Sequence, residues 1–330
     1  MAEGAILIIG PSWIGDMVMA HALVQAVAAQ NTGAPIDLLA PAWAASLIAR
    51  MPEVRQAVAA PFAHARFGLK ERWKLGRSLR GRYTTAYVLP GSWKSALVPF
   101  FAGIEHRIGY LKEQRYLLLN DIRSLPKPLK RKTALGYQRL ADAGPLRTPR
   151  LVVDAANQAA LQRRFGLKRS FVALMPGAEY GPAKRWPERH YAEFARTMLG
   201  RGLDVVILGS KNDHPVGVAI ASLAPGARNL CGETQLADAI DLLAAARLAV
   251  TNDSGLMHVA ASVGTPLVAV FGSTSPDNTP PIAEKSVVVT LRLPCSPCLQ
   301  RVCPLGHLDC LQKLGPETVL ANADRLMGAA

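Results

Sequence analysis

Charged and hydroxyl side chains occur in short segments that directly follow apolar runs of the sequence. Asp16 comes soon after the run AILII, and Lys184 lies in PGAEYGPAKRWP, which begins where the run FVALM ends. Asp213 lies in LGSKNDH, again at the end of an apolar run. A lysine in such a loop can bind a phosphate, and a carboxylate can bind a ribose diol. These segments therefore indicate a site for a nucleotide-bearing ligand.

The segment TNDSGLMHVAASVGTPLVAVFGSTSP (251–276) carries the strongest signal. An apolar strand is expected to end at its start, and a helix to begin directly afterwards. The start of a helix exposes backbone N–H groups and a positive dipole, which suit a diphosphate. The residues predicted to bind there are Asp253, Ser254, Gly255, Leu256 and His258, followed after the helix by Ser273 and Thr274.

Each of these side chains also has a structural interpretation. Asp253 can cap the helix, His258 can be a core histidine, and Asp213 can cap a helix of its own. Lys184 can be a solvated loop lysine, and Asp16 can be a first-turn carboxylate that complements a helix dipole. Local sequence leaves these alternatives open, whereas the combination of several such loops favours a ligand site.

Apolar runs alternate with helix-compatible stretches, and the pattern occurs twice. This alternation predicts parallel sheets with crossover helices, and therefore two α/β domains, 1–160 and 161–330, with a linker near Asp154 to Arg169. Ligands in such sheets bind at the carboxyl ends of the strands, so the site is expected in a cleft between the sheets. The expected strands lie at residues 5–10, 36–41 and 85–91 and, after a polar region at 125–149, at 171–177, 204–210, 248–253 and 266–273.

The positive charge is concentrated in one half of the chain. Residues 1–165 contain 23 Lys and Arg against 10 Asp and Glu, whereas the rest contains 15 against 14. The densest basic stretch, residues 66–83, suits nucleic acid, anionic lipid or a phosphorylated glycan, and a solvated basic helix is the structural alternative. Its expected apolar stripe is Phe67, Trp73, Leu79 and Tyr83, beside Arg72, Lys74, Arg77 and Arg80.

Several common functions are disfavoured by motifs that the sequence lacks. It has no G-x-x-x-x-G-K-[ST], the motif of a P-loop phosphotransferase, and no G-x-G-x-x-G after the first strand, the motif of a dehydrogenase. It has no D-x-D pair for Mg²⁺, so a diphosphate would be met by helix N-termini and Lys184, and no cofactor is expected to be required. No run reaches the roughly 20 apolar residues that cross a bilayer, and no export leader is expected, so we predict a cytoplasmic location.

The sequence resembles the heptosyltransferases of glycosyltransferase family 9 over nearly its full length. This resemblance implies a GT-B fold, an α/β fold of two Rossmann-like domains whose parallel sheets face each other across a cleft, with the C-terminal helix packing back on the first domain. It implies inverting transfer of L-glycero-D-manno-heptose from ADP-heptose to the heptosyl-Kdo-lipid A inner core of lipopolysaccharide. The segments that carry it are GPSWIGDMVM, VLPGSWKSALVPFFAGI, RIGY, PGAEYGPAKRWP, NDSGLMHVAA and VFGSTSPDNTPP.

The resemblance also implies roles for individual residues. Asp16 corresponds to the general base, because inversion by a single displacement needs a proton acceptor opposite the departing ADP. Lys184 corresponds to the donor-phosphate lysine and Asp213 to an acidic ribose contact. The predicted heptose and diphosphate contacts are Asp253, Gly255, Leu256 and His258, and the acceptor is expected to bind in the basic half, near Ser12, Lys94, Arg107 and Arg115.

Two alternative functions and several partners follow from the same observations. A family 9 transferase for another core or O-chain acceptor is one alternative, and a nucleic-acid-binding protein, which lacks support from any known motif, is the other. The expected partners are ADP-heptose, the lipopolysaccharide acceptor and the anionic inner membrane, with no nucleic acid and a monomeric chain.

The segment CSPCLQRVCPLGHLDC places four cysteines close together. Cys295, Cys298, Cys303 and Cys310 begin with a C-x-x-C pair of the kind found in zinc sites, although the spacing is not that of two such pairs. Disulfides are disfavoured in the cytoplasm. A structural zinc site and reduced loop thiols are therefore the two interpretations.

Overall fold

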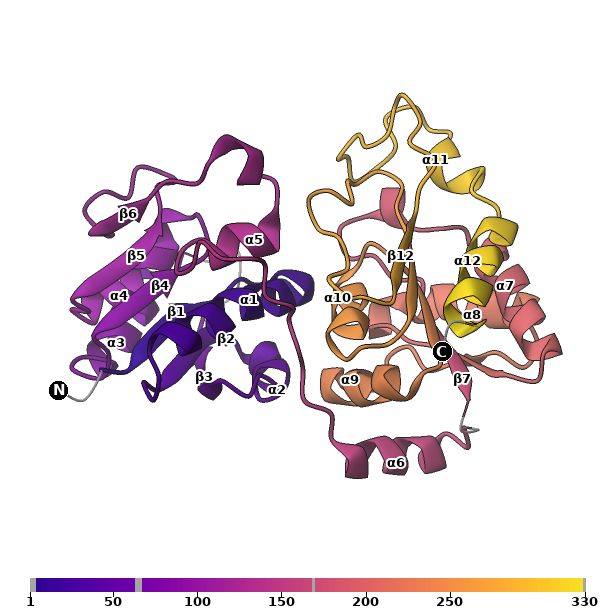
Figure 1. Cartoon of the computed structure of the whole chain (residues 1–330), viewed down its shortest axis with the longest axis horizontal. Coiled ribbons are helices and arrows are strands. Elements are labelled where there is room, and N and C mark those ends of the chain that lie inside the picture. The colour runs from indigo at the N-terminus through magenta and orange to yellow at the C-terminus, as the bar shows by residue number, and fades with distance from the viewer. Residues whose placement is uncertain (1–3, 63–66, 168–169, 329–330) are drawn as a thin grey trace. The chain divides into compact units, whose positions relative to one another are not determined.

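The chain forms two compact units, Met1–Pro149 and Arg150–Ala330, in a computed structural model that describes residues 4–62, 67–167 and 170–328 (Figure 1). The division comes earlier in the chain than the boundary expected at residue 160, which lies inside helix α6 (Ala155–Arg164). This helix begins in the expected linker because the Asp154 carboxylate caps it, accepting the N–H groups of the second and third residues that follow.

The sheet of the first unit is parallel throughout, with the strand order β3-β2-β1-β4-β5-β6. Strand β1 is buried at every position, as is typical of a parallel strand covered on both faces. The strand order reverses between β1 and β4, which is the arrangement of a Rossmann sheet. The strands are β1 (Ile6–Ile9), β2 (Ile36–Pro41), β3 (Val54–Ala60), β4 (Thr85–Val88), β5 (His106–Tyr110) and β6 (Asp121–Arg123).

The second unit repeats this topology, with the order β12-β11-β10-β7-β8-β9 and parallel pairing throughout. Strands β7 and β10 are adjacent at its centre and are also buried at every position. The order therefore reverses between β7 and β10. The strands are β7 (Phe171–Met175), β8 (Asp204–Ile207), β9 (Arg228–Asn229), β10 (Leu248–Asn252), β11 (Leu267–Val270) and β12 (Ser286–Val289).

In the first unit, α1 packs against α5 and α3 packs against α4. Helix α1 is buried over almost its whole length from Met17 to Val27, which accounts for its apolar composition. On the α3–α4 side, Leu7 and Ile9 of β1 share a core cluster with Leu97 of α4. The helices are α1 (Ile14–Gln30), α2 (Ala45–Ile48), α3 (Leu69–Ser78), α4 (Leu97–Phe101) and α5 (Thr133–Gln138), with 3-10 turns η1 (Ala42–Ala44), η2 (Trp93–Ala96) and η3 (Lys127–Leu129).

The apolar stripe expected in residues 66–83 is wrong in part. Leu79 and Tyr83 come after the end of α3 and are buried in the core of the first unit. Phe67 and Trp73 are exposed instead. Arg72 is buried, where its guanidinium donates to the backbone oxygens of Phe67 and Lys94 at 2.7 and 3.1 Å.

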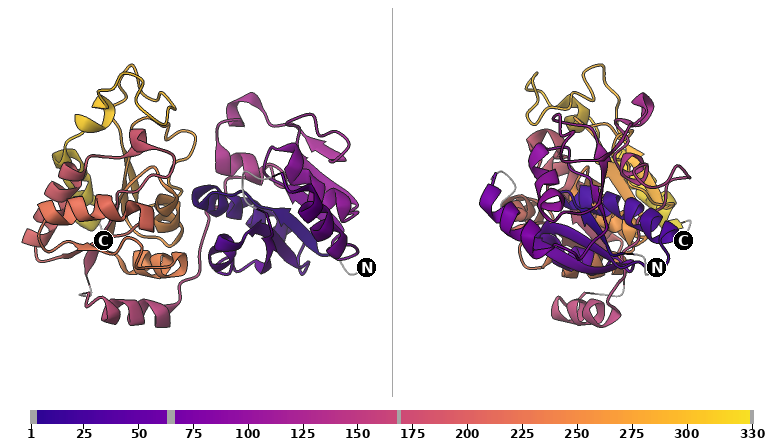
Figure 2. Two further views of the ribbon diagram at one scale, coloured as in Figure 1. Left: turned by 180° about the vertical axis from the view of Figure 1, so that it is seen from behind. Right: turned by 90° about the vertical axis from the view of Figure 1, so that its left-hand side faces the viewer.

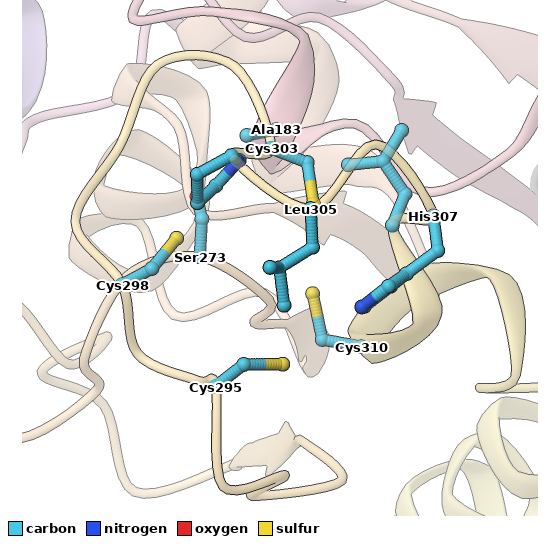
Figure 3. A pocket seen from close by; sticks show the side chains of 10 residues that line it. Ala183, Ser273, Cys295, Cys298, Cys303, Leu305, His307 and Cys310 are labelled. Atoms are coloured by element: carbon cyan, nitrogen blue, oxygen red, sulfur yellow. The ribbon is translucent and has the colours of Figure 1, made fainter.

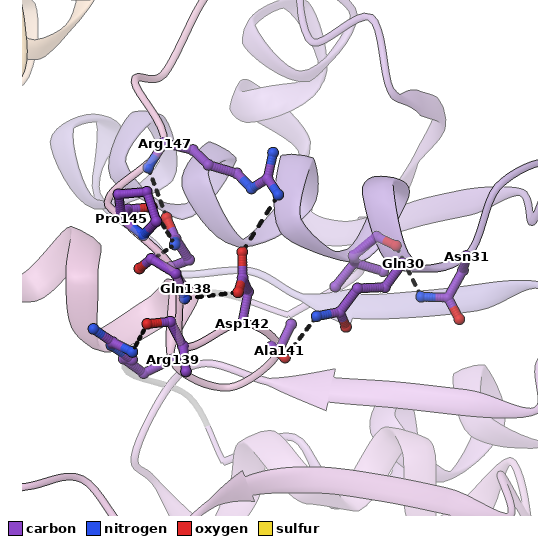
Figure 4. Close-up of polar contacts among 11 residues, drawn as sticks. Gln30, Asn31, Gln138, Arg139, Ala141, Asp142, Pro145 and Arg147 are labelled. Carbon is purple, nitrogen blue, oxygen red and sulfur yellow. Dashed lines mark hydrogen bonds and ion pairs between the residues drawn. The ribbon is translucent and has the colours of Figure 1, made fainter.

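The segment that follows α5 is tied to the first unit by side-chain amides (Figure 4). Gln30, at the end of α1, donates to the Ala141 oxygen at 3.0 Å. Gln138 donates to the Pro145 oxygen at 2.8 Å and accepts the Arg147 N–H at 2.7 Å. The proline-bearing region thus belongs to the first unit up to the division at Pro149.

In the second unit, α7 packs against α8 and α12 on one side of the sheet, and α9 packs against α10 and α6 on the other (Figures 1 and 2). The C-terminal helix α12 contacts α7 and strands β10, β11 and β12 of its own unit, and its packing on the first unit stays a prediction. The helices are α7 (Glu188–Gly200), α8 (His214–Leu223), α9 (Leu236–Ala245), α10 (Gly255–Ser262), α11 (Asp309–Gln312) and α12 (Pro316–Gly328), with turns η4 (Pro182–Lys184) and η5 (Lys211–Asp213).

Two residues named in the sequence analysis lie outside the described ranges. They are Arg66, at the start of the basic stretch, and Arg169, at the end of the expected linker. Among the helices that the structure describes, none combines the length and apolar character needed to cross a bilayer.

Candidate functional site

The loops that follow β7 and β10 flank the point where the strand order of the second sheet reverses. In open α/β sheets this switch point forms the crevice in which ligands bind. Lys184 lies in η4 after β7, and Asp253 and Ser254 lie between β10 and α10. The topology therefore brings the Lys184 segment to the same place as the segment that carries the strongest sequence signal.

Asn252, the last residue of β10, joins these two loops. Its buried amide oxygen accepts the Trp186 N–H and the Tyr191 hydroxyl, each at 3.0 Å, and its amide nitrogen donates to the Pro176 oxygen at 2.6 Å. Three hydrogen bonds from one buried side chain fix the loop after β7 against the end of β10.

Lys184 and Asp253 form an ion pair inside this site. The Lys184 Nζ lies 2.6 Å from Oδ2 of Asp253 and 3.3 Å from its backbone oxygen. The Thr274 hydroxyl donates to the same Oδ2 at 2.6 Å. Both charged side chains are largely removed from solvent. A phosphate that binds Lys184 would therefore share its ammonium donors with Asp253.

The N-terminus of α10 has the form expected for an anion site. Ser254, rather than Asp253, is the N-cap, and its hydroxyl accepts the Met257 N–H at 3.4 Å. Gly255 and Leu256 are the first two helical residues, and their N–H groups have no acceptor within the helix. The dipole of α10 adds partial positive charge beside Lys184 and Asp253.

His258 lies in the second turn of α10 and is almost fully buried. Burial lowers its pKa to about 4, the Asp253 carboxylate opposes this shift, and the Lys184 charge adds to it. The imidazole is therefore neutral near pH 7 and would contact a ligand through a hydrogen bond rather than through positive charge.

Asp213 and Ser273 lie outside the Lys184–Asp253 pair, and of the two only the Asp213 side chain has a hydrogen-bond partner within the described ranges. One Asp213 oxygen accepts the backbone N–H and the hydroxyl of Ser210, at 2.9 and 2.7 Å, in a capping box at η5. Its carboxylate also faces Gly177, where an added Cβ would lie 2.6 Å from it. Ser273 is buried, and its hydroxyl has no hydrogen-bond partner among the described residues.

In the first unit, the residues after β1 and β4 flank the corresponding switch point. Asp16 lies in the first turn of α1, and Ser12 lies in the short loop that precedes it. Lys94 lies in η2 after β4. Burial and, secondarily, the Asp16 charge raise the pKa of Tyr137 in α5, which marks this phenol as a neighbour of the carboxylate.

Two arginines expected near the acceptor bind the protein's own backbone. Arg115 is buried, and its guanidinium donates to the oxygens of Pro90 at 2.6 Å and Tyr110 at 2.9 Å, and to the Ser95 hydroxyl at 3.0 Å. Arg107 donates from its Nε to Leu118 at 2.8 Å. Arg115 thus braces the loop that leads to Lys94, and contact of either arginine with an acceptor stays a prediction.

Comparison with known proteins gives a family for this arrangement. The model of glycosyltransferase family 9 (heptosyltransferase) matches residues 72–309. The chain belongs to glycosyltransferase family 9. This glycosyltransferase is 45% identical to lipopolysaccharide heptosyltransferase 2 of Escherichia coli K12 over 345 residues, covering 98% of each chain. It is 45% identical to lipooligosaccharide heptosyltransferase 2 of Haemophilus influenzae over 305 residues, covering 87% of this chain and 88% of the relative.

A solved structure is similar as well. The structure of E. coli ADP-heptose lps heptosyltransferase II matches the family 9 glycosyltransferase with a TM-score of 0.88 and 42% identity, over 98% of this chain and 99% of that chain. The predicted fold class, α/β with two Rossmann-like units of the GT-B type, is thereby confirmed.

Four of the five cysteines of this glycosyltransferase line a pocket in the second unit (Figure 3). Cys295, Cys298, Cys303 and Cys310 all contribute to its wall, together with Ser273 and His307 among others. No disulfide joins them. Within the described ranges, no three His, Cys, Asp or Glu side chains are grouped as a metal ion would require, and the zinc site stays a prediction.

The cysteine loop, defined as residues 295–310, is hydrogen-bonded to the loops that follow β7 and β11. Leu299 donates its N–H to the Ser273 oxygen at 2.7 Å and accepts the Tyr180 hydroxyl at 2.8 Å. The Tyr180 ring centroid lies 5.0 Å from the Lys184 Nζ and 5.2 Å from the Arg301 guanidinium. The loop therefore holds the Tyr180 ring that lies against Lys184.

Three functional neighbours were missed from the sequence. Asn252 and Tyr180 stand within the segments that were singled out, but nothing local indicates their partners, which are far away in the chain. Tyr137 lies in a helix that carried no signal, and only the packing of α5 on α1 brings it toward Asp16.

Proposed function

We propose that this glycosyltransferase transfers L-glycero-D-manno-heptose from ADP-heptose to heptosyl-Kdo-lipid A, with inversion at the anomeric carbon. The main support for this proposal is the similarity, over nearly the whole chain, to a lipopolysaccharide heptosyltransferase 2 and to the solved heptosyltransferase II. The proposal is supported by the convergence of Lys184, Asp253 and the start of α10 at a switch point.

The donor diphosphate would bind at this switch point. Lys184 supplies an ammonium group, and the first N–H groups of α10 supply directed donors, so the negative charge is met without a required metal ion. Asp253 and Thr274 hold the Lys184 ammonium in position before the donor arrives. The neutral His258 would donate or accept a hydrogen bond at the same helix.

The chemical step would be a single displacement. The acceptor hydroxyl oxygen forms a bond to the anomeric carbon while the bond from that carbon to the diphosphate oxygen breaks, and ADP leaves with the electron pair. The proton of the hydroxyl passes to the Asp16 carboxylate. Asp16 lies in the first turn of α1, where the helix dipole favours negative charge.

Three further features of the proposal concern where the enzyme works. A cytoplasmic location and a monomeric chain are part of the proposal. The acceptor would bind in the basic first unit, with Ser12 and Lys94 at its switch point. Contact with the anionic inner membrane fits the excess of Lys and Arg there.

Substitution of Asp16 tests the assignment of the base. Asp16→Asn keeps the size of the side chain but removes its proton affinity, so we expect kcat to fall about 10²–10⁴-fold with unchanged thermal unfolding. Transfer is measured with ADP-heptose and purified heptosyl-Kdo-lipid A, and NMR of the product gives its anomeric configuration.

Glu317→Gln is the matched control, because Glu317 is also a first-turn carboxylate, in α12. It should leave the rate unchanged. Near wild-type transfer by Asp16→Asn would refute the base, and a retained anomeric configuration would refute the single displacement. Transfer only to longer or shorter core acceptors would refute the acceptor while leaving the family intact.

A further inference from the structure

Helix α3 of the first unit presents an exposed face that combines apolar and basic side chains. Leu69 and Trp73, one turn apart, are each 46% exposed. Lys70, Lys74 and Arg77 are exposed beside them, and the Arg77 guanidinium lies 5.6 Å from the centre of the Trp73 ring. At helical spacing these five residues occupy one side of α3.

The opposite side of α3 accounts for its packing. Gly76 lies so close to α4 that an added Cβ would be 2.6 Å from the Cβ of Phe101. Arg72 is buried on this side, with its guanidinium 3.6 Å from the Phe62 ring centroid. The single acidic residue of the helix, Glu71, is half-buried and lies near Gly68. None of the α3 residues on the exposed side is therefore a carboxylate, although Glu113, from outside the helix, accepts the Trp93 backbone N–H beside this face at 2.6 Å. Among the described residues, neither Leu69 nor Trp73 belongs to the unit's core cluster.

An aromatic pair extends this face toward the carboxyl end of the sheet. Phe67 and Trp93 stack with their ring centroids 6.2 Å apart and their planes 16° apart. They are 48% and 40% exposed. Trp93 begins η2, directly before Lys94 and after the end of β4. The α3 face, meaning Phe67, Leu69, Lys70, Trp73, Lys74, Arg77 and Trp93, is thus continuous with the switch point.

We propose that the α3 face docks the enzyme on a bilayer that contains anionic phospholipids. Trp and Leu side chains enter the interface between headgroups and acyl chains, while Lys and Arg bind lipid phosphates. The first unit, residues 1–149, carries 20 Lys and Arg against 9 Asp and Glu, so its charge is complementary to such a surface.

The side-chain pairing favours lipid over nucleic acid. Single-stranded nucleic acid binds through bases stacked on aromatic rings along a basic groove. In the α3 face, Phe67 and Trp93 stack on each other and Arg77 lies against the Trp73 ring. The aliphatic Leu69 offers a base nothing to stack on, whereas it can enter a lipid interface. The docking rests on the face itself, and only its benefit, proximity to a lipid-linked acceptor, rests on the proposed function.

The test is co-sedimentation of the full chain with vesicles of phosphatidylcholine and increasing phosphatidylglycerol. We expect binding that rises with anionic lipid and falls with salt. Lys70→Glu/Lys74→Glu and, separately, Leu69→Ser/Trp73→Ser should each weaken the partition coefficient about tenfold or more. Circular dichroism and thermal unfolding show that each variant is folded, and transfer to a soluble, lipid-free acceptor should be unchanged.

Two matched controls lie in the second unit. Val218→Ser/Leu223→Ser removes exposed apolar side chains of α8, which are 49% and 47% exposed. Lys285→Glu/Arg325→Glu reverses two exposed charges. Both should bind vesicles as the wild type does. Equal loss in controls and α3 variants, no vesicle binding at low salt, or displacement of the protein from vesicles by RNA would overturn the proposal. Vesicle binding needs no catalysis, so it can succeed or fail independently of heptose transfer.

Discussion

Lys184 and Asp253 are the residues whose chemistry in the second unit depends most on each other. The ion pair is largely buried, and Thr274 adds a third partner on the carboxylate. Removal of one partner from a buried pair is more harmful than removal of both, because a single buried charge is left without compensation. The binding role proposed for Lys184 therefore comes with a structural need for Asp253.

This dependence predicts a recovery of stability without a recovery of binding. Lys184→Met should lower the free energy of unfolding by about 3 kcal/mol. It should also weaken the binding of ADP-heptose, which is measured as a raised KM. Lys184→Met/Asp253→Asn should regain most of the stability but not the KM. Urea unfolding and initial rates give the two quantities, with the exposed Lys285→Met as control. If the double variant were no more stable than Lys184→Met, the ion pair would not be the reason for the loss.

His258 predicts a pH effect on stability. Burial holds its pKa at about 4 in the folded protein, against about 6.5 for an unfolded histidine. Between these values the unfolded chain binds more protons, so stability falls as the pH falls. From pH 7 to pH 5 the loss from this residue is about 2 kcal/mol.

The measurement is urea unfolding of the wild type and His258→Gln at both pH values. The variant should lose about 2 kcal/mol less between them. His106→Gln is the control, since His106 is an exposed histidine of the first unit. An identical pH dependence in wild type and His258→Gln would contradict the depressed pKa.

At the scale of elements, the cysteine loop joins the core of the second unit to the loops that follow β7 and β11. Cys310 belongs to the core cluster of the second unit, and burial followed by the neighbouring cysteines raises its pKa. The Cys303 thiol has a lowered pKa because backbone N–H groups, first that of Leu308, point toward it. Gly181 is packed against this loop so closely that an added Cβ would be 2.5 Å from the Arg301 oxygen.

The zinc prediction belongs to this element. If the four thiols bind zinc, protein purified under reducing conditions should contain about one zinc per chain, and Cys295→Ser/Cys298→Ser should lose it. Loss of the metal should also loosen the loop that holds Tyr180, which raises the KM for ADP-heptose. Cys231→Ala is the control, because this buried cysteine lies outside the loop. Zinc well below one per chain in the wild type would leave reduced thiols as the answer.

At the scale of the whole molecule, the central strands could be predicted because they are apolar and buried on both faces. Strand β2 begins and ends where its pattern predicts. Strand β3 and the two-residue β9 show no continuous apolar pattern. They lie at the edges of their sheets, where fewer residues are buried, and Arg55 and Gln56 of β3 are exposed.

The site was predictable where it depends on strand ends and helix starts, and not where it depends on distant partners. The loops after β7 and β10 could be predicted to lie close together, because the carboxyl ends of parallel strands meet at one edge of a sheet. Arg115 was expected near the acceptor because it lies in the basic half of the chain, and no sequence signal shows that its guanidinium binds backbone oxygens in the interior.

The two units predict a localised response to nucleotide. ADP at about 100 times its Kd should stabilise the folded protein by about 2.7 kcal/mol. In hydrogen exchange of the full chain, protection should be strongest in the segments after β7 and β10, within Arg150–Ala330. GMP serves as the control ligand, with little protection expected. Protection confined to residues 4–149 would place the nucleotide in the wrong unit and refute the donor site.

The amide of Asn252 has a consequence for the thermodynamics of binding. Since its three hydrogen bonds already unite the two segments on either side of the switch point, neither has to become ordered when a nucleotide arrives. Little conformational entropy is then lost on association, and more of the interaction enthalpy remains as affinity. An aspartate at this position would turn a second acceptor toward the Pro176 carbonyl, and the crevice would lose its rigidity before it lost any group that touches the sugar nucleotide.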